Sequence, residues 1–106
     1  MEPIGVNMID EDILQYNELI DNFRRLDSSN YTNAYKLAQT SIMLADRWNE
    51  IMLNSVQYSK EYEVTKSEFS NYAYQKYKIL MKIHDFARMI YRQGVYGITN
   101  SFYNED

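Results

Sequence analysis

Apolar residues recur at intervals of three and four along most of the chain, which is the spacing of one helix face. The first such stretch predicts a short helix over 10–27, with apolar positions Ile13, Tyr16, Leu19, Ile20, Phe23 and Leu26. Asp10 is predicted to cap its start, because an aspartate there can accept the free backbone N–H groups of the first turn. The polar run at 27–30 is predicted to end it, because short polar side chains compete for backbone hydrogen bonds.

A second and longer periodic stretch covers 31–93. Its first half carries a stripe in which small and large residues mix: Ala34, Leu37, Ala38, Ser41, Leu44, Ala45, Trp48, Ile51, Met52 and Ser55. Small residues let two helices approach closely, so this stripe predicts close helix packing. The same period returns in the second half at Ala73, Leu80, Ile83, Ala87 and Ile90.

The polar middle of this stretch, 57–68, leaves two architectures open. Thr65 with Glu68 three residues later has the pattern of a capping box, which predicts that a helix restarts here and that the chain folds into an antiparallel hairpin. The alternative is one helix of about 60 residues, roughly 90 Å long, which would need partners to bury its stripe. Gly94 is predicted to end the last helix, leaving an apolar tail over 94–106.

The distribution of helix breakers points to the same fold class. All three glycines and the single proline lie outside 6–93, which is hard to reconcile with a sheet and its turns. We therefore predict one all-α domain. A thin chain with so much apolar stripe is also predicted to form homo-oligomers. The candidate residues for an oligomer or partner interface are Leu37, Leu44, Trp48, Ile51 and Met52.

Charge is distributed unevenly along the chain, whose net charge is −4. Residues 1–33 carry seven acidic side chains and two arginines, whereas 76–106 carry five basic side chains and three acidic ones. An acidic protein is a poor candidate for binding nucleic acid unless its cations gather on one face. On a helical wheel they do gather: Tyr74, Lys78, Lys82, Arg88 and Arg92 share one side, interrupted by Asp85.

This basic side has two interpretations. Clustered cations can follow a phosphate backbone while tyrosine rings stack on unpaired bases, which is how many proteins bind single strands. The candidate nucleic-acid-binding residues are Lys78, Lys82, Arg88, Arg92, Tyr74 and Tyr77. The alternative is a solvated helix face whose cations pair with the acidic first helix.

The composition excludes several kinds of chemistry. There is no cysteine, so disulfides, thiolate metal sites and a cysteine nucleophile are excluded. His84 adjoins Asp85, but neighbours on a helix point about 100° apart and do not form a catalytic base with its orienting partner. The acidic run at 10–12 lacks the glycine and the later glutamate of a calcium loop. We expect no enzymatic activity, no cofactor and no metal.

No apolar run approaches the roughly 20 residues that span a bilayer. The first residues lack the basic and apolar regions of a secretory signal. We therefore expect a cytoplasmic protein that does not enter a membrane.

Two segments carry a resemblance to a known family. In 38–50, an alanine-containing approach precedes the triplet Ile42-Met43-Leu44, and Arg47 is followed by Trp48. In 89–100, a basic residue and a turn precede tyrosine, isoleucine and asparagine at alternate positions. Together with the tyrosine-rich patch at 72–77, these segments resemble the UvsY-type recombination mediators of T4-like phages.

The resemblance implies a small helical protein that forms ring-like oligomers. It further implies binding to single-stranded DNA, weakening of the hold of the single-strand-binding protein, and assistance in loading a RecA-like recombinase. In that case the protein is phage-encoded and acts in the host cytoplasm. The family's lysine- and arginine-rich run is represented here by Lys66, Lys76 and Lys78. The alternative expectation is a helical interaction or structural protein, such as a virion component or a small inhibitor of a host protein, that binds no nucleic acid.

Overall fold

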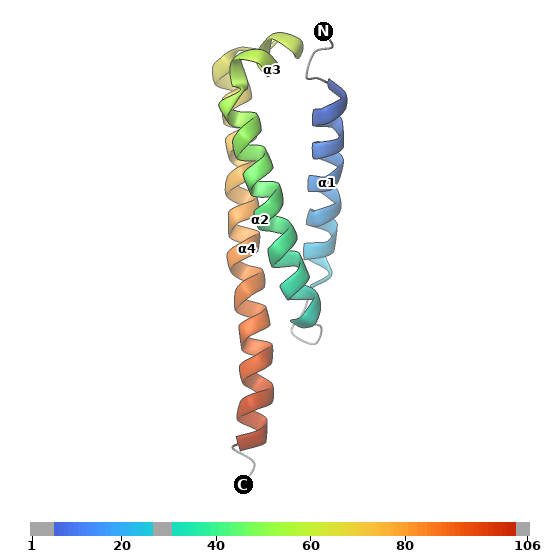
Figure 1. Cartoon of the computed structure of the whole chain (residues 1–106), viewed down its shortest axis with the longest axis vertical. Coiled ribbons are helices and arrows are strands. Elements are labelled where there is room, and N and C mark those ends of the chain that lie inside the picture. The colour runs from blue at the N-terminus through green and yellow to red at the C-terminus, as the bar shows by residue number, and fades with distance from the viewer. Residues whose placement is uncertain (1–5, 27–30, 104–106) are drawn as a thin grey trace.

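The computed structural model describes residues 6–26 and 31–103, with side chains for 9–26 and 31–95. This part of the chain contains four helices and no strand: α1 (Val6–Arg24), α2 (Tyr31–Leu53), α3 (Ser55–Glu61) and α4 (Lys66–Tyr103). The predicted all-α fold class is confirmed. α2 and α4 run antiparallel as a long hairpin, and α1 lies along one side of it (Figure 1). The hairpin alternative is therefore the architecture observed.

The core lies between α2 and α4, and the stripe predicted for α2 forms its centre. Nine of the ten predicted stripe residues are buried, and Met52 is partly buried. Alanines at 34, 38 and 45 of α2 and at 73 and 87 of α4 are buried, so the two backbones approach closely. Trp48, Ile51 and Leu80 are the large side chains that fill the space between them.

The turn of the hairpin is built from two capping motifs in succession. α3 ends in a Schellman arrangement, in which the backbone N–H of Val64 donates to Ser59 (3.0 Å) and that of Glu63 donates to Lys60 (3.4 Å). Glu63 has a left-handed backbone with φ of 55°. α4 then begins with the predicted capping box, because the Thr65 hydroxyl accepts from the Glu68 N–H at 3.0 Å and the Glu68 carboxylate accepts from the Thr65 N–H at 3.4 Å.

α1 begins earlier than predicted. It starts at Val6, so Asp10 lies inside the helix and the prediction that it caps the first turn is wrong. The helix ends at Arg24, three residues before the predicted end, and the predicted stop at 27–30 lies outside the described residues. α1 is held to α4 by an edge-on contact between the rings of Phe23 and Phe86, whose centroids are 5.5 Å apart.

α4 also ends later than predicted. It continues through Gly94 to Tyr103, so the prediction of a helix end at Gly94 and a separate tail from 94 is wrong. The glycine serves a different purpose, because a Cβ at this position would overlap Cβ and Cγ of Tyr31 in α2. Gly94 thus allows the start of α2 to lie against α4. Beyond this contact the backbone of α4 continues past the first residue of α2 (Figure 1).

Candidate nucleic-acid interface

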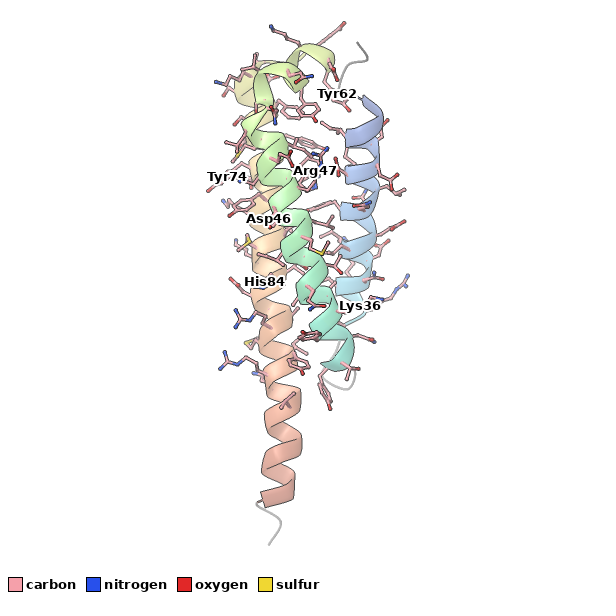
Figure 2. All side chains as sticks on the ribbon, viewed as in Figure 1. Lys36, Asp46, Arg47, Tyr62, Tyr74 and His84 are labelled. Atoms are coloured by element: carbon pink, nitrogen blue, oxygen red, sulfur yellow. The ribbon has the colours of Figure 1, made fainter. Side chains whose placement is uncertain are left out.

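Five of the six predicted binding residues, all except Tyr77, lie together on the side of α4 that faces away from the core. Lys82, Arg88 and Arg92 are exposed, Tyr74 is 43% exposed, and Lys78 is half-buried. Figure 2 shows Tyr74 and His84 on the side of the hairpin away from α1, whereas Lys36 lies on the side toward α1. We call the face formed by Tyr74, Lys78, Lys82, Arg88 and Arg92 the outer face of α4.

The tyrosines at one end of the outer face form a small cluster with a lysine. The rings of Tyr74 and Tyr77 lie nearly parallel, with centroids 6.5 Å apart and planes 28° apart. Nζ of Lys78 lies 5.2 Å from the centre of the Tyr74 ring, which is within the range of a cation–π contact. Tyr77 is half-buried and packs against the core. Tyr74 is therefore the ring whose surface is more open to a ligand.

The cations of the outer face have no acidic partners within the described part of the chain. None of Lys78, Lys82, Arg88 and Arg92 lies within 4 Å of a described carboxylate. The single acid in their midst, Asp85, contacts its neighbour, because Nδ1 of His84 lies 3.2 Å from Oδ1 of Asp85, although the 100° between helix neighbours argued against such a contact. The alternative in which these cations pair with α1 is therefore not what the structure shows.

The other lysine of this region, Lys76, lies on the opposite side of α4 in an aromatic cage. Its Nζ is 4.2 Å from the ring centre of Tyr16, 4.6 Å from that of Tyr72 and 5.7 Å from that of Trp48. Burial lowers the pKa of Lys76 and raises the pKa values of Tyr16 and Tyr72. Lys76 thus links α1, α2 and α4, and its ammonium group is turned away from the outer face.

An ion pair joins α1 to α2 near this cage. Nε of Arg47 donates to Oδ2 of Asp12 at 3.0 Å, and a second guanidinium nitrogen lies 3.5 Å from Glu50. Burial raises the pKa of Asp12, and the charge and hydrogen bond of Arg47 offset that effect in part. Arg47 lies between α1 and α2 (Figure 2). The sequence held no signal of this pair, because its members are 35 positions apart.

The residues predicted for an oligomer or partner interface lie instead inside the chain's own core. Leu37 and Leu44 are at most 9% exposed, and Trp48 and Ile51 are fully buried. The indole of Trp48 packs edge-on against Tyr16 and Tyr72. These four side chains are therefore not surface-accessible as an interface, because the hairpin and α1 already cover the stripe. Met52 is half-buried and packs against the same core.

One feature that sequence reasoning missed is a groove between α2 and α4 that opens beside Arg88 and Arg92. It has a volume of about 350 Å³, and its other walls include Tyr35, Gln39 and Tyr91. The rings of Tyr35 and Tyr91 lie 5.1 Å apart. No local pattern marks this groove, because the residues that line it on α2 lie more than 40 positions before those that line it on α4.

The described residues include no group of three or more histidine, cysteine, aspartate or glutamate side chains that could hold a metal ion. None of the helices, as far as they are described, is long and apolar enough to cross a membrane. Comparison with known protein families, with characterised proteins and with solved structures finds no match to this chain.

Proposed function

We propose that this chain is a non-enzymatic helical assembly factor that binds single-stranded DNA along the outer face of α4. The observation that carries the proposal is the set of four cations, Lys78, Lys82, Arg88 and Arg92, none of which has a described carboxylate within 4 Å. Because these cations form no ion pair with a described carboxylate, a phosphate can bind them without first breaking such a pair. They span 15 residues of a helix, a rise of about 21 Å from the first to the last.

A strand lying along this face would meet both kinds of group that single-strand binding uses. Its phosphates would follow the four cations, and an unpaired base would stack on the open ring of Tyr74, with Tyr77 behind it. A base inside a duplex is already stacked and paired, so the tyrosines favour single strands. The site needs no proton transfer, nucleophile or metal.

The biological part of the proposal comes from the sequence resemblance. Segment 38–50 resembles UvsY-type mediators, and so do the alternate tyrosine, isoleucine and asparagine of 89–100, although α4 runs through the turn expected there. This resemblance supports a role in displacing a single-strand-binding protein and loading a recombinase. Under this role the expected partners are further copies of this chain, a recombinase and a single-strand-binding protein. Strand binding is the step that the rest of this role requires, so it is the step to test first.

The test is a charge reversal on the outer face, Lys82→Glu with Arg88→Glu. Both side chains are exposed, so the helix and core should remain intact. We expect the affinity for a fluorescein-labelled oligothymidylate, measured by fluorescence anisotropy at about 50 mM salt, to fall at least about tenfold. Circular dichroism of the variant should match that of the wild type.

The matched control is Lys36→Glu with Lys60→Glu, which makes the same change in net charge at two exposed lysines outside α4. It should lower the affinity far less than the outer-face pair. Equal losses in the two variants would mean that only net charge matters, and the assignment of the site to α4 would be wrong.

A helical interaction protein that binds no nucleic acid is the second candidate. Met43 and Leu53 of α2 are 70% and 75% exposed, which is unusual for large apolar side chains. α1 also exposes the acids Glu11, Glu18 and Asp21. Under this function the outer-face reversal would leave the activity unchanged, and substitution of Met43 or Leu53 would abolish partner binding.

A further inference from the structure

The groove between α2 and α4 offers the features that a nucleobase requires, at the far end of the outer face from Tyr74. Arg88 and Arg92 stand on one wall, one helical turn apart, and both belong to the outer face. Tyr35 and Tyr91 form the aromatic part of the groove. The cationic face and the groove are therefore continuous.

The aromatic wall is held in place from behind. The centroid of Tyr91 lies 5.1 Å from that of Tyr35 and 6.0 Å from that of Tyr31. Tyr31 in turn occupies the space that the missing side chain of Gly94 leaves open. Tyr35 remains 50% exposed, so half of its surface is available for stacking. A ring that is fixed on one side and open on the other is well suited to stack on a ligand base.

Polar groups in the groove match the edge of a base. Nε2 of Gln39 donates to the Tyr35 hydroxyl at 3.1 Å, which orients the amide. The amide oxygen of Gln39 has no hydrogen-bond partner among the described residues, and it can accept from a ring N–H or an exocyclic amino group. Ala38 and Ile42 add apolar side chains to the lining of the groove. An apolar lining with a few oriented polar groups is typical of a small-ligand site.

We infer that this groove receives one nucleobase of the bound strand, which stacks on Tyr35 while Arg88 and Arg92 hold the phosphates on either side of it. The inference rests on the proposed function and adds a specific base-binding subsite to it. A volume of about 350 Å³ is at the lower end of small-ligand sites and is sufficient for one base. A base can enter only when it is unpaired, and the groove therefore adds to the preference for single strands.

The experiment compares two labelled strands of equal length and charge, an oligothymidylate and a strand whose sugars carry no bases. Because phosphate contacts are the same for both, the ratio of their dissociation constants measures the contribution of the bases. We expect the full-length wild-type protein to bind the base-bearing strand at least about fivefold more tightly. Tyr35→Leu should reduce that ratio and leave the affinity for the abasic strand unchanged.

Two further variants separate ring stacking from damage to the fold. Tyr35→Phe keeps the ring and loses only the hydrogen bond to Gln39, so it should retain most of the base preference. Tyr62→Leu alters a tyrosine at the turn end of the hairpin, and it should leave the ratio unchanged (Figure 2). Its hydroxyl makes no hydrogen bond with the described residues, but its ring stacks on Phe69 with centroids 6.2 Å apart, so circular dichroism should show that this variant stays folded.

Photocrosslinking then locates the base directly. A strand with one 4-thiothymidine is irradiated in complex with the protein, and the adducts are mapped by tryptic peptide mass spectrometry. Cleavage after lysine and arginine puts Tyr35 and Tyr91 on peptides 26–36 and 89–92, and Tyr74 and Tyr77 on peptides 67–76 and 77–78. Adducts on 26–36 or 89–92 are the expected result.

The outcomes distinguish this inference from the proposed function. Strand binding with adducts only on 67–76 or 77–78, or with a base preference that Tyr35→Leu does not change, would overturn the groove and leave strand binding on the outer face standing. Failure of the wild type to bind either strand at about 50 mM salt would overturn both.

Discussion

At the scale of single residues, Lys76 and Lys78 show how position on a helix decides what a cation does. Both belong to the thin basic run of the sequence, but residues two apart on a helix point about 200° from each other. Lys78 lies beside Tyr74 on the outer face, whereas Lys76 is enclosed by Tyr16, Trp48 and Tyr72. Of the two lysines, only Lys78 is available to a phosphate.

The burial of Lys76 has a consequence for stability at alkaline pH. Because burial lowers the pKa of Lys76 in the folded protein, the folded state binds fewer protons than the unfolded chain in the window between the lowered pKa and 10.5. The free energy of unfolding therefore gains a contribution from Lys76 that rises with pH in this window. Below the lowered pKa, Lys76 is charged in both the folded and the unfolded state, so the full penalty of burying its charge reduces the free energy of unfolding.

The test is to subtract the free energy of unfolding of Lys76→Met from that of the wild type, by urea denaturation at several pH values from 7 to 10. The difference should increase with pH. The raised pKa values of Tyr16 and Tyr72 act in the opposite direction, but both proteins contain these tyrosines, so their effects largely cancel. A difference that does not change with pH for Lys76→Met would contradict the cage.

At the scale of elements, the turn shows which features local sequence can specify. The pair Thr65 and Glu68 predicted the start of a helix, and the capping box is confirmed. The end of α3 carried no such signal, because Glu63 occupies the left-handed position where glycine is usual. The choice between a hairpin and a single long helix therefore stayed open.

The candidate site also has one part that local sequence could specify and one part that it could not. The outer face of α4 was predictable, since 100° per residue decides which side chains share a face of one helix. The groove with Tyr35 and Tyr91 was not predictable, because it depends on the register between two helices. Gly94 was misassigned for a related reason, since a glycine at a helix end and a glycine at a close helix contact look alike in sequence.

Gly94 provides a test of the packing of α2 against α4. Alanine at 94 gains about 1 kcal/mol in helix propensity, but overlap with Tyr31 should cost more, as overpacking typically costs about 1–3 kcal/mol. We expect Gly94→Ala to lower the free energy of unfolding by up to about 2 kcal/mol, measured by urea denaturation.

The same substitution in a Tyr31→Gly background should have the opposite sign. Without the Cβ and the ring of Tyr31 the overlap is gone, and only the gain in helix propensity, up to about 1 kcal/mol, remains. A Gly94→Ala change that stabilises the protein in both backgrounds would show that Tyr31 does not lie against α4 at this position.

At the scale of the whole molecule, charge is separated across a narrow rod with extents of 66 × 21 × 20 Å. α1 carries exposed acids along one side of the hairpin, and the outer face of α4 carries four cations that have no described carboxylate within 4 Å. The net charge of −4 therefore conceals a local surface of the opposite sign. Oligomerisation stays a prediction. The stripe expected to drive it is buried within the chain, so a homo-oligomer would have to form through another surface.

The most direct test of strand binding on this surface is its salt dependence. Counterion release from a single strand gives a slope of about −0.7 per phosphate contact in a plot of log affinity against log salt concentration. Four contacts, from Lys78, Lys82, Arg88 and Arg92, give a slope of about −3 at most, or up to roughly a 50-fold loss of affinity between about 50 and 200 mM salt. Fluorescence anisotropy with a labelled oligothymidylate should show a slope that approaches this limit, together with weaker binding to a duplex of the same length. No binding at about 50 mM salt, or an affinity that salt does not change, would contradict it.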